Sequence, residues 1–157
     1  MNEEVKYISY EEAISVYAKM IDASDGGFDG VRDEGGIRAA LEFVQNDMYY
    51  PNFSDKLCSL VYKFCSGHYF NDGNKRIALT LGAYFLYKNS YFWQATIFMR
   101  QMESIVYHVA ASNIDQDLLH RIMTCFMNDE DYDEELKIDI ANAMSRGELG
   151  VRGEDYE

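Results

Sequence analysis

Apolar side chains recur every three or four positions along most of the chain, which is the spacing of helices that bury one face. Between these periodic stretches, residues 91–97 are rich in aromatic side chains and are expected to be extended. The pattern predicts seven helices, which begin near Ser9, Asp33, Ser54, Lys75, Phe98, Asp115 and Asp133.

Residue types at the ends of these segments favour the same division. Ser9 and Glu12 have the spacing of a capping box, and Asp33 is a suitable N-cap for the second helix. Residues 24–30 are rich in Asp and Gly and are expected to separate these two helices. Pro51 lacks the N–H group that a helix interior needs, so the segment around it is expected to be a connection.

The fold class that follows is an all-α, single-domain bundle. The helix that starts near Lys75 is the most apolar, so we expect it to be central. At most a small β-hairpin flap fits, around residues 47–53 or 91–96. We expect the main domain to cover residues 1–128 and an acidic C-terminal extension to cover 129–157.

Composition and charge limit the kinds of partner. The net charge is −13, and from residue 129 onward 11 acidic residues face 3 basic ones. Such a chain repels polyanions, so we expect no nucleic-acid partner. It has no run of 18 apolar residues and no signal-peptide pattern at its N-terminus, so we expect no membrane contact and a cytoplasmic location. The three cysteines lack metal-ligand spacing and are expected to be reduced core residues.

The chemically informative residues lie together in nine positions, His68 to Arg76, with the sequence HYFNDGNKR. Gly67 is expected to end the third helix, and an Asn-Asp-Gly-Asn turn then leads into the fourth. Backbone N–H groups at a helix N-terminus, together with the helix dipole, favour a bound anion. The segment therefore predicts a phosphate site with an imidazole and a carboxylate beside it.

Two residues of this segment are candidates for catalysis and metal binding. His68 can accept a proton from a hydroxyl near neutral pH, which makes it the candidate general base. Asp72 is the candidate ligand for Mg²⁺ that arrives with a nucleotide, because Mg²⁺ prefers oxygen and takes few protein ligands when phosphates supply the others. A helix N-cap or an Asx-turn is the alternative role of Asp72.

The next four residues form the candidate nucleotide-binding set. Gly73 lets a phosphate approach the backbone, and Asn74 is expected both to bind and to hold the loop in shape. Lys75 and Arg76 oppose the dipole at a helix start, so a bound anion explains them better than solvent exposure does. Phe70 is expected to be a buried anchor for the loop.

This stretch resembles the signature of the Fic/Doc family, and most closely its Doc branch, which carries His-x-Phe-x-Asp-Ala/Gly-Asn-Lys-Arg. The nucleotidyl-transferring Fic branch has Gly where Lys75 stands. Weaker similarities lie at residues 30–41 and at Tyr49-Tyr50-Pro51, where the family has a flap that helps to hold a target peptide. The similarity runs from about Tyr7 to Met127.

The resemblance implies a Fic-type helical bundle and a Doc-like toxin of a toxin–antitoxin system. Such an enzyme would use ATP and Mg²⁺ to transfer a phosphoryl group to a Ser or Thr hydroxyl of a target protein. The resemblance suggests a translation factor such as elongation factor Tu as the target, and a separate antitoxin as a partner. Two alternatives stay open, namely transfer of AMP by the same base and anion site, and a binding module that has lost catalysis.

Two positions depart from the family pattern. Leu79 stands where the Fic branch has a second arginine that clamps the γ-phosphate, and the Doc branch lacks that arginine too. Ser66 stands where Doc-like proteins commonly have arginine. The lost phosphate contact could be supplied by Arg32, Lys63 or Arg100.

The acidic segment 129–135 has two interpretations. The first is a solvated tail, which is the usual role of such a run of charges. The second is an antitoxin mimic that lies over Lys75 and Arg76.

Overall fold

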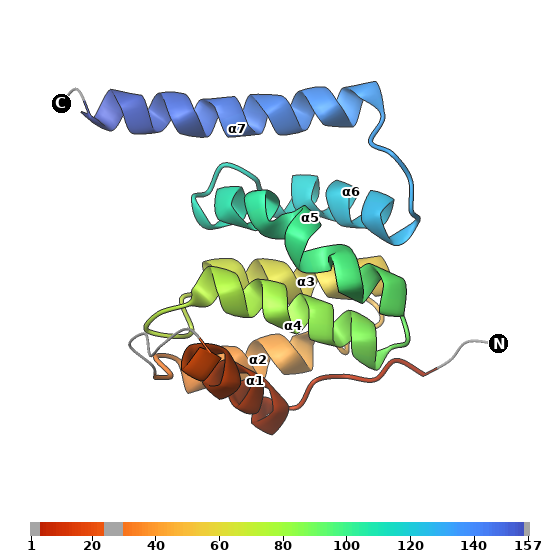
Figure 1. The fold of residues 1–157 in the computed structure, drawn as a ribbon. Helices are drawn as coiled ribbons and strands as arrows, with labels where there is room; N and C mark the ends of the chain where they lie inside the picture. Colours follow the sequence, from red (N-terminus) through yellow and green to blue (C-terminus); the bar gives the residue numbers. More distant parts are fainter. Residues whose placement is uncertain (1–3, 24–29, 156–157) are drawn as a thin grey trace.

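The computed structural model describes residues 4–23 and 30–155, with side chains up to residue 146. The described residues form an all-α bundle without strands, which confirms the expected fold class. Figure 1 shows the helices stacked in layers, with α1 and α2 below α3 and α4, then α5 and α6, and α7 across the top. The helices are α1 (Tyr10–Ala23), α2 (Glu34–Phe43), α3 (Phe53–Ser66), α4 (Asn74–Lys88), α5 (Phe92–Ala110), α6 (Gln116–Met127) and α7 (Glu134–Asp155).

The first two helices begin where the capping residues predicted. The N–H of Glu12 donates to Ser9 Oγ at 3.1 Å, and the N–H of Ser9 donates to Glu12 Oε1 at 3.2 Å. At the start of α2, the N–H of Gly36 donates to the Asp33 carboxylate at 2.8 Å. The predicted interruption between these helices falls at residues 24–30, of which 24–29 lie outside the described residues.

Two expectations about helix starts were wrong. Ser54 does not cap α3, because the helix begins one residue earlier, at Phe53, and Asn52 is its N-cap. The Asp55 carboxylate accepts the N–H of Asn52 at 2.8 Å, which closes the first turn. Residues 91–97 are not extended either, since α5 begins at Phe92 and the N–H of Ala95 already donates to the Tyr91 carbonyl.

Helix α4 is the centre of the bundle, as expected. It packs against α1, α3 and α5, and it buries side chains on more than one face. Across the α1–α4 contact, the Glu12 carboxylate accepts from Tyr84 Oη at 2.5 Å and also pairs with the Lys88 ammonium. This network fixes α1 against the helix that carries the candidate site.

The C-terminal helix α7 packs against α6 at the far side of the bundle from α1. Its first turns bury Leu136, Ile140 and Ala143. An ion pair of 2.7 Å joins Arg121 on α6 to Asp139 on α7. Among the helices described, none is long and apolar enough to cross a bilayer.

Candidate active site

The nine-residue motif forms the loop between α3 and α4 and its first helical turn. Gly67 caps the end of α3, where its N–H donates to the Lys63 carbonyl at 2.8 Å. A Cβ at this position would lie 2.5 Å from the ring of Tyr69 and 2.6 Å from that carbonyl, so only glycine fits. The next residue, His68, has a φ of 53°, a left-handed conformation that is uncommon outside glycine. The sharp reversal leaves the His68 side chain exposed.

Phe70 anchors the loop, as the sequence indicated. Its side chain is 1% exposed and stacks on Tyr17 of α1, with ring centroids 4.0 Å apart. Its backbone forms an isolated β-bridge with Val31. On either side of this bridge, the N–H of Arg32 donates to the Tyr69 carbonyl at 2.8 Å, and a matching bond ties residue 71 to residue 30. The segment before α2 therefore holds the motif loop in place.

The side chain of Asn74 closes the loop from the other side. Its Oδ1 accepts the N–H of Phe70 at 3.1 Å, and its Nδ2 donates to the Phe70 carbonyl at 3.0 Å. The Asn74 amide thus pairs with both the N–H and the carbonyl of Phe70, as the backbone of a neighbouring β-strand would. The side-chain amide of Asn74 therefore supports the loop, while its backbone begins α4.

Gly73 precedes α4 in a left-handed conformation with φ of 79°. A Cβ there would lie 3.0 Å from Met20 Cε. The N–H of Gly73 donates to the carboxylate of Asp72 at 2.8 Å, and Tyr17 Oη donates to the Asp72 carbonyl at 2.9 Å. Asp72 is exposed, so its carboxylate remains open to solvent beside the helix start.

The first turn of α4 has the features of an anion site. Its first intrahelical bond runs from the N–H of Ile77 to the Gly73 carbonyl at 2.8 Å. The N–H groups of Asn74 and Lys75 precede that bond, at the end of a helix where backbone donors have no acceptor within the helix. The side chains of Lys75 and Arg76 are exposed. Backbone donors and two cations therefore meet at one helix end.

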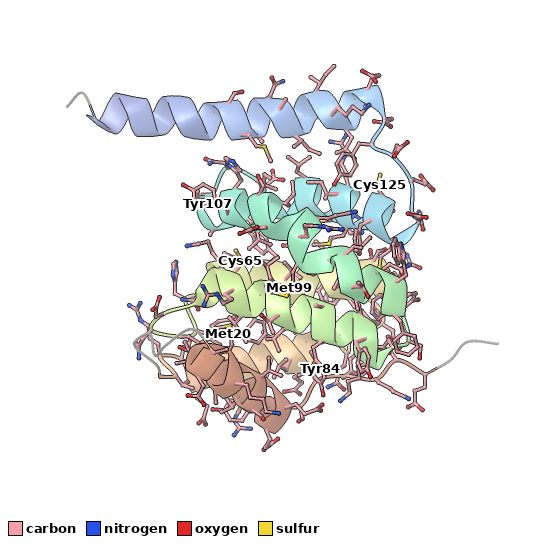
Figure 2. The ribbon with its side chains drawn as sticks, viewed as in Figure 1. Met20, Cys65, Tyr84, Met99, Tyr107 and Cys125 are labelled. Atoms are coloured by element: carbon pink, nitrogen blue, oxygen red, sulfur yellow. The ribbon has the colours of Figure 1, made fainter. Side chains whose placement is uncertain are left out.

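All six predicted site residues line one cleft of about 940 Å³: His68, Asp72, Gly73, Asn74, Lys75 and Arg76. The walls come from α1, α3 and α5 as well as from the motif, and Figure 2 labels Met20, Cys65, Met99 and Tyr107 among the residues that line it. The structure thus places the candidate base, the carboxylate and the anion site around a shared space.

Of the α5 residues that line the cleft, Arg100 was one of the candidates named from the sequence, whereas Glu103 and Tyr107 were not foreseen. Arg100, Glu103 and Tyr107 lie one helical turn or so apart on this wall. They follow the motif by more than 20 residues, and no local pattern connects them to it. Only the packing of α5 on α4 brings them to the cleft.

The fold distinguishes among the three residues that could replace the missing phosphate contact. Arg100 lines the cleft, whereas Arg32 and Lys63 do not. The Lys63 ammonium instead lies 4.0 Å from the centre of the Phe43 ring. Ser66 also turns away, since its hydroxyl donates to the Tyr62 carbonyl at 2.6 Å. Arg100 is therefore the additional cation that can meet a ligand of this cleft.

Cys65 lies in the cleft wall but is a poor nucleophile. Burial raises the pKa of its thiol to about 11, although the charge of Lys75 lowers it in part. The thiol donates to the Val106 carbonyl at 3.3 Å. Cys65 therefore stays protonated at neutral pH and serves as a core residue, as expected.

The donor set of the cleft fits a magnesium ion that brings its own phosphate ligands. Among the residues with described side chains, no group of three or more His, Cys, Asp or Glu could enclose a metal. Asp72 offers one oxygen ligand next to an anion site. Mg²⁺ commonly takes one or two carboxylates and completes its shell with phosphate and water.

The acidic segment does not lie over Lys75 and Arg76, so the antitoxin-mimic interpretation is wrong. Residues 129–132 line a separate hollow beside Trp93 and Gln94, in the first turn of α5. Figure 1 shows the α6–α7 connection and the α3–α4 loop at opposite ends of the bundle. The N–H of Glu130 donates to the Cys125 carbonyl, which fixes the segment there.

Comparisons with known proteins agree with this geometry. The model of the Fic/DOC family matches residues 7–86, which are 80 of the 157 residues. This range includes the motif and the helices on which it rests. The chain is also 35% identical over 88 residues to the protein kinase doc of Escherichia phage P1, covering 54% of this chain and 69% of that protein. The chain therefore belongs to the Fic/Doc family, and its similarity lies with the Doc branch.

Proposed function

We propose that this protein is a Doc-like enzyme that transfers the γ-phosphoryl group of ATP to a Ser or Thr hydroxyl of a target protein. The observation that carries the proposal is the single cleft shared by His68, Asp72 and the cationic start of α4. A base, an oxygen ligand and an anion site are the groups that phosphoryl transfer needs.

His68 acts as the base. Among the described residues its imidazole has no hydrogen-bond partner, so it is available to a hydroxyl that enters the cleft. The imidazole takes the proton while the hydroxyl oxygen bonds to the γ-phosphorus. The bond between that phosphorus and the bridging oxygen breaks, and ADP leaves with the electron pair.

The start of α4 stabilises the phosphate charges. The ammonium of Lys75, the guanidinium of Arg76 and the backbone N–H groups at the start of α4 line the cleft where the phosphates would lie. Arg100 adds a cation from the α5 wall of the cleft. Asp72 would be the protein ligand of a bound Mg²⁺, which would supply positive charge to the phosphates.

Two residues favour phosphoryl over nucleotidyl transfer. Lys75 stands where the nucleotidyl-transferring branch has glycine, and the cleft residue Leu79 stands where that branch has a second arginine. An apolar side chain cannot clamp a γ-phosphate, so the terminal phosphate is left free to react. The relative in phage P1 is likewise named a protein kinase.

The biological setting completes the proposal. The protein acts as the toxin of a toxin–antitoxin pair in the cytoplasm, with a translation factor such as elongation factor Tu as its target. A separate antitoxin would hold it inactive. The resemblance to Doc-like toxins supports these assignments.

The test is paired labelling of a bacterial lysate with ATP labelled at the γ- or the α-phosphate, in the presence of Mg²⁺. Wild type is compared with His68→Ala and with His108→Ala. His108 is the matched control, because it lies outside the cleft and pairs with the Asn113 side chain at 3.0 Å. We expect a band with γ-label alone, retained in the His108 variant and absent in the His68 variant.

The other outcomes are informative. A band with α-label that depends on His68 would overturn phosphoryl transfer and establish transfer of AMP. If neither label gave a His68-dependent band, while calorimetry showed ATP binding, the protein would be a binding module.

A further inference from the structure

Three aromatic side chains remain exposed at the corner between α4 and α5, far from the cleft. Tyr87, Phe92 and Trp93 are 61%, 55% and 63% exposed. The rings of Tyr87 and Phe92 meet edge to face, with centroids 5.3 Å apart. Trp93 follows Phe92 directly in the first turn of α5, and large exposed aromatic side chains grouped in this way are typical of an interaction site. We call these three residues the aromatic corner.

The aromatic corner is held firmly. Asn89 caps the end of α4, and its side chain donates to the Lys6 carbonyl at 2.9 Å. The N–H of Tyr91 donates to the Leu86 carbonyl at 2.9 Å. The exposed rings are therefore presented by a fixed backbone, which lowers the entropy lost when a partner binds.

An acidic hollow continues this surface. Trp93 lines a hollow of about 370 Å³ whose opposite wall is the α6–α7 connection, with Asp129, Glu130, Asp131 and Tyr132. The three carboxylates are exposed, and none forms an ion pair with another described residue. The hollow thus combines three carboxylates that form no ion pair among the described residues with the aromatic residues Trp93, Phe126 and Tyr132.

This combination selects the chemistry of an occupant. A Lys or Arg side chain can place its cation against the Trp93 ring and the carboxylates at once. A neighbouring apolar side chain of the same segment can cover the Tyr87–Phe92 pair. A second copy of this chain fits poorly, because its net charge of −13 would bring like charges together. Nucleic acid is repelled for the same reason.

We propose that the aromatic corner and the acidic hollow form a docking surface for a Lys/Arg-rich, partly apolar segment of a partner protein. The surface is separate from the catalytic cleft. Figure 2 shows Cys125, which lines the hollow, at the opposite side of the bundle from Cys65 and Tyr107 of the cleft. The proposal therefore does not depend on the proposed enzymatic activity.

Trp93 supplies the measurement, because it is the single tryptophan of the chain. The probe is an amphipathic Lys/Leu peptide, titrated into the full-length protein while tryptophan fluorescence is followed. A Glu/Leu peptide of the same length is the control. We expect a saturable fluorescence change with the Lys/Leu peptide alone, and a weaker affinity at higher salt.

Two matched variants distinguish this surface from general attraction to an acidic protein. The first neutralises the hollow with Asp129→Asn, Glu130→Gln and Asp131→Asn. The second neutralises three exposed carboxylates on α1 and α2 with Glu11→Gln, Asp22→Asn and Glu42→Gln. Both change the net charge equally, but distant surface charges are screened at physiological salt. We expect affinity to fall about tenfold in the first variant and less than about twofold in the second.

Several results would overturn the proposal. Equal weakening in both variants would mean non-specific attraction, and a saturating fluorescence change with the Glu/Leu peptide would mean that charge does not select the partner. A fluorescence change on concentrating the protein alone, with a dimer in sedimentation, would identify a second copy as the occupant. Unchanged affinity in Phe92→Ser would remove the apolar half of the surface.

Discussion

The left-handed conformation of Gly73 gives a sharp test of how the site is built. Its φ of 79° sets the direction in which α4 leaves the loop, and so the direction of the helix-start N–H groups. Replacing Gly73 with alanine adds a Cβ that disfavours this conformation and lies 3.0 Å from Met20 Cε. The matched control is Gly35→Ala in the first turn of α2. There φ is not positive, and the new Cβ would make an ordinary contact of 3.7 Å with an Asp33 carboxylate oxygen.

The magnitudes follow from the two backbones. A non-glycine residue in the left-handed region costs about 1–2 kcal/mol, and the flexible end of Met20 can yield to the new methyl group. Gly73→Ala should therefore lower the free energy of unfolding by about 1–2 kcal/mol, and Tm by about 2–8 °C for a chain of this length. Gly35→Ala should raise the unfolding free energy by about 0.5 kcal/mol, because alanine favours a helix over glycine.

Thermal unfolding followed by circular dichroism measures the change in stability, and calorimetric titration with ATP measures the change in nucleotide affinity. If Gly73→Ala turns the N–H groups away from the cleft, ATP should bind about tenfold more weakly, while Gly35→Ala should bind normally. A Gly73→Ala protein with the stability of wild type would refute the reasoning about the backbone. If folded Gly73→Ala protein bound ATP as tightly as wild type, the proposed role of the helix start in binding would be refuted.

Three other substitutions test the support of the site. Hydrogen bonds from Lys88 and Tyr84 hold the pKa of Glu12 at about 2, against an ordinary value of 4.5, and the side chain is 32% exposed. Full burial would make this worth about 3 kcal/mol, and solvent screening reduces it to about 1–2 kcal/mol. Because the folded-state pKa of Glu12 is depressed, this stability is fully present above pH 4.5 and is lost as the pH falls towards 2. In urea unfolding, Glu12→Gln should therefore lower the free energy of unfolding at pH 7 but not at pH 2. Asn74→Ala should cost about 1–3 kcal/mol, since both backbone groups of the buried Phe70 lose their partner. Arg100→Ala should raise the Kd for ATP about tenfold in calorimetry, whereas Lys63→Ala should leave it unchanged.

Each of these tests has a result that contradicts it. Glu11→Gln, at an exposed neighbouring position, should change stability by less than about 0.5 kcal/mol, so an equal loss in both variants would argue against the network with Lys88. Asn74→Asp keeps the acceptor but loses the donor, and a variant as stable as wild type would show that the bond to the Phe70 carbonyl is unimportant. Equal Kd values for the Arg100 and Lys63 variants would exclude a specific contact from α5.

Much of the site could be predicted because its parts are adjacent in sequence. His68, Asp72 and the start of α4 belong to one turn and one helix end, so their proximity needs only local geometry. For the additional cation the sequence offered Arg32, Lys63 and Arg100 without deciding among them, since nothing near Arg100 connects it to the motif, and only the packing of α5 places it in the cleft. The prediction of an extended conformation for residues 91–97 was wrong because Phe92 and Trp93 are exposed. The helical spacing of buried apolar residues therefore begins only at Ile97, although the helix begins at Phe92.

Local chemistry thus determined the helices with strong caps and the motif itself. Ser9, Asp33 and Gly67 act within a few residues of their own position, and their effect can be read from the neighbouring sequence. Only the tertiary structure decided the long-range relations. It buried Lys56 to 2% exposure, with its ammonium 2.7 Å from Asp47, and it placed the acidic segment beside Trp93 and away from the cleft. These contacts depend on how helices pack, and many sequences with the same periodicity could pack differently.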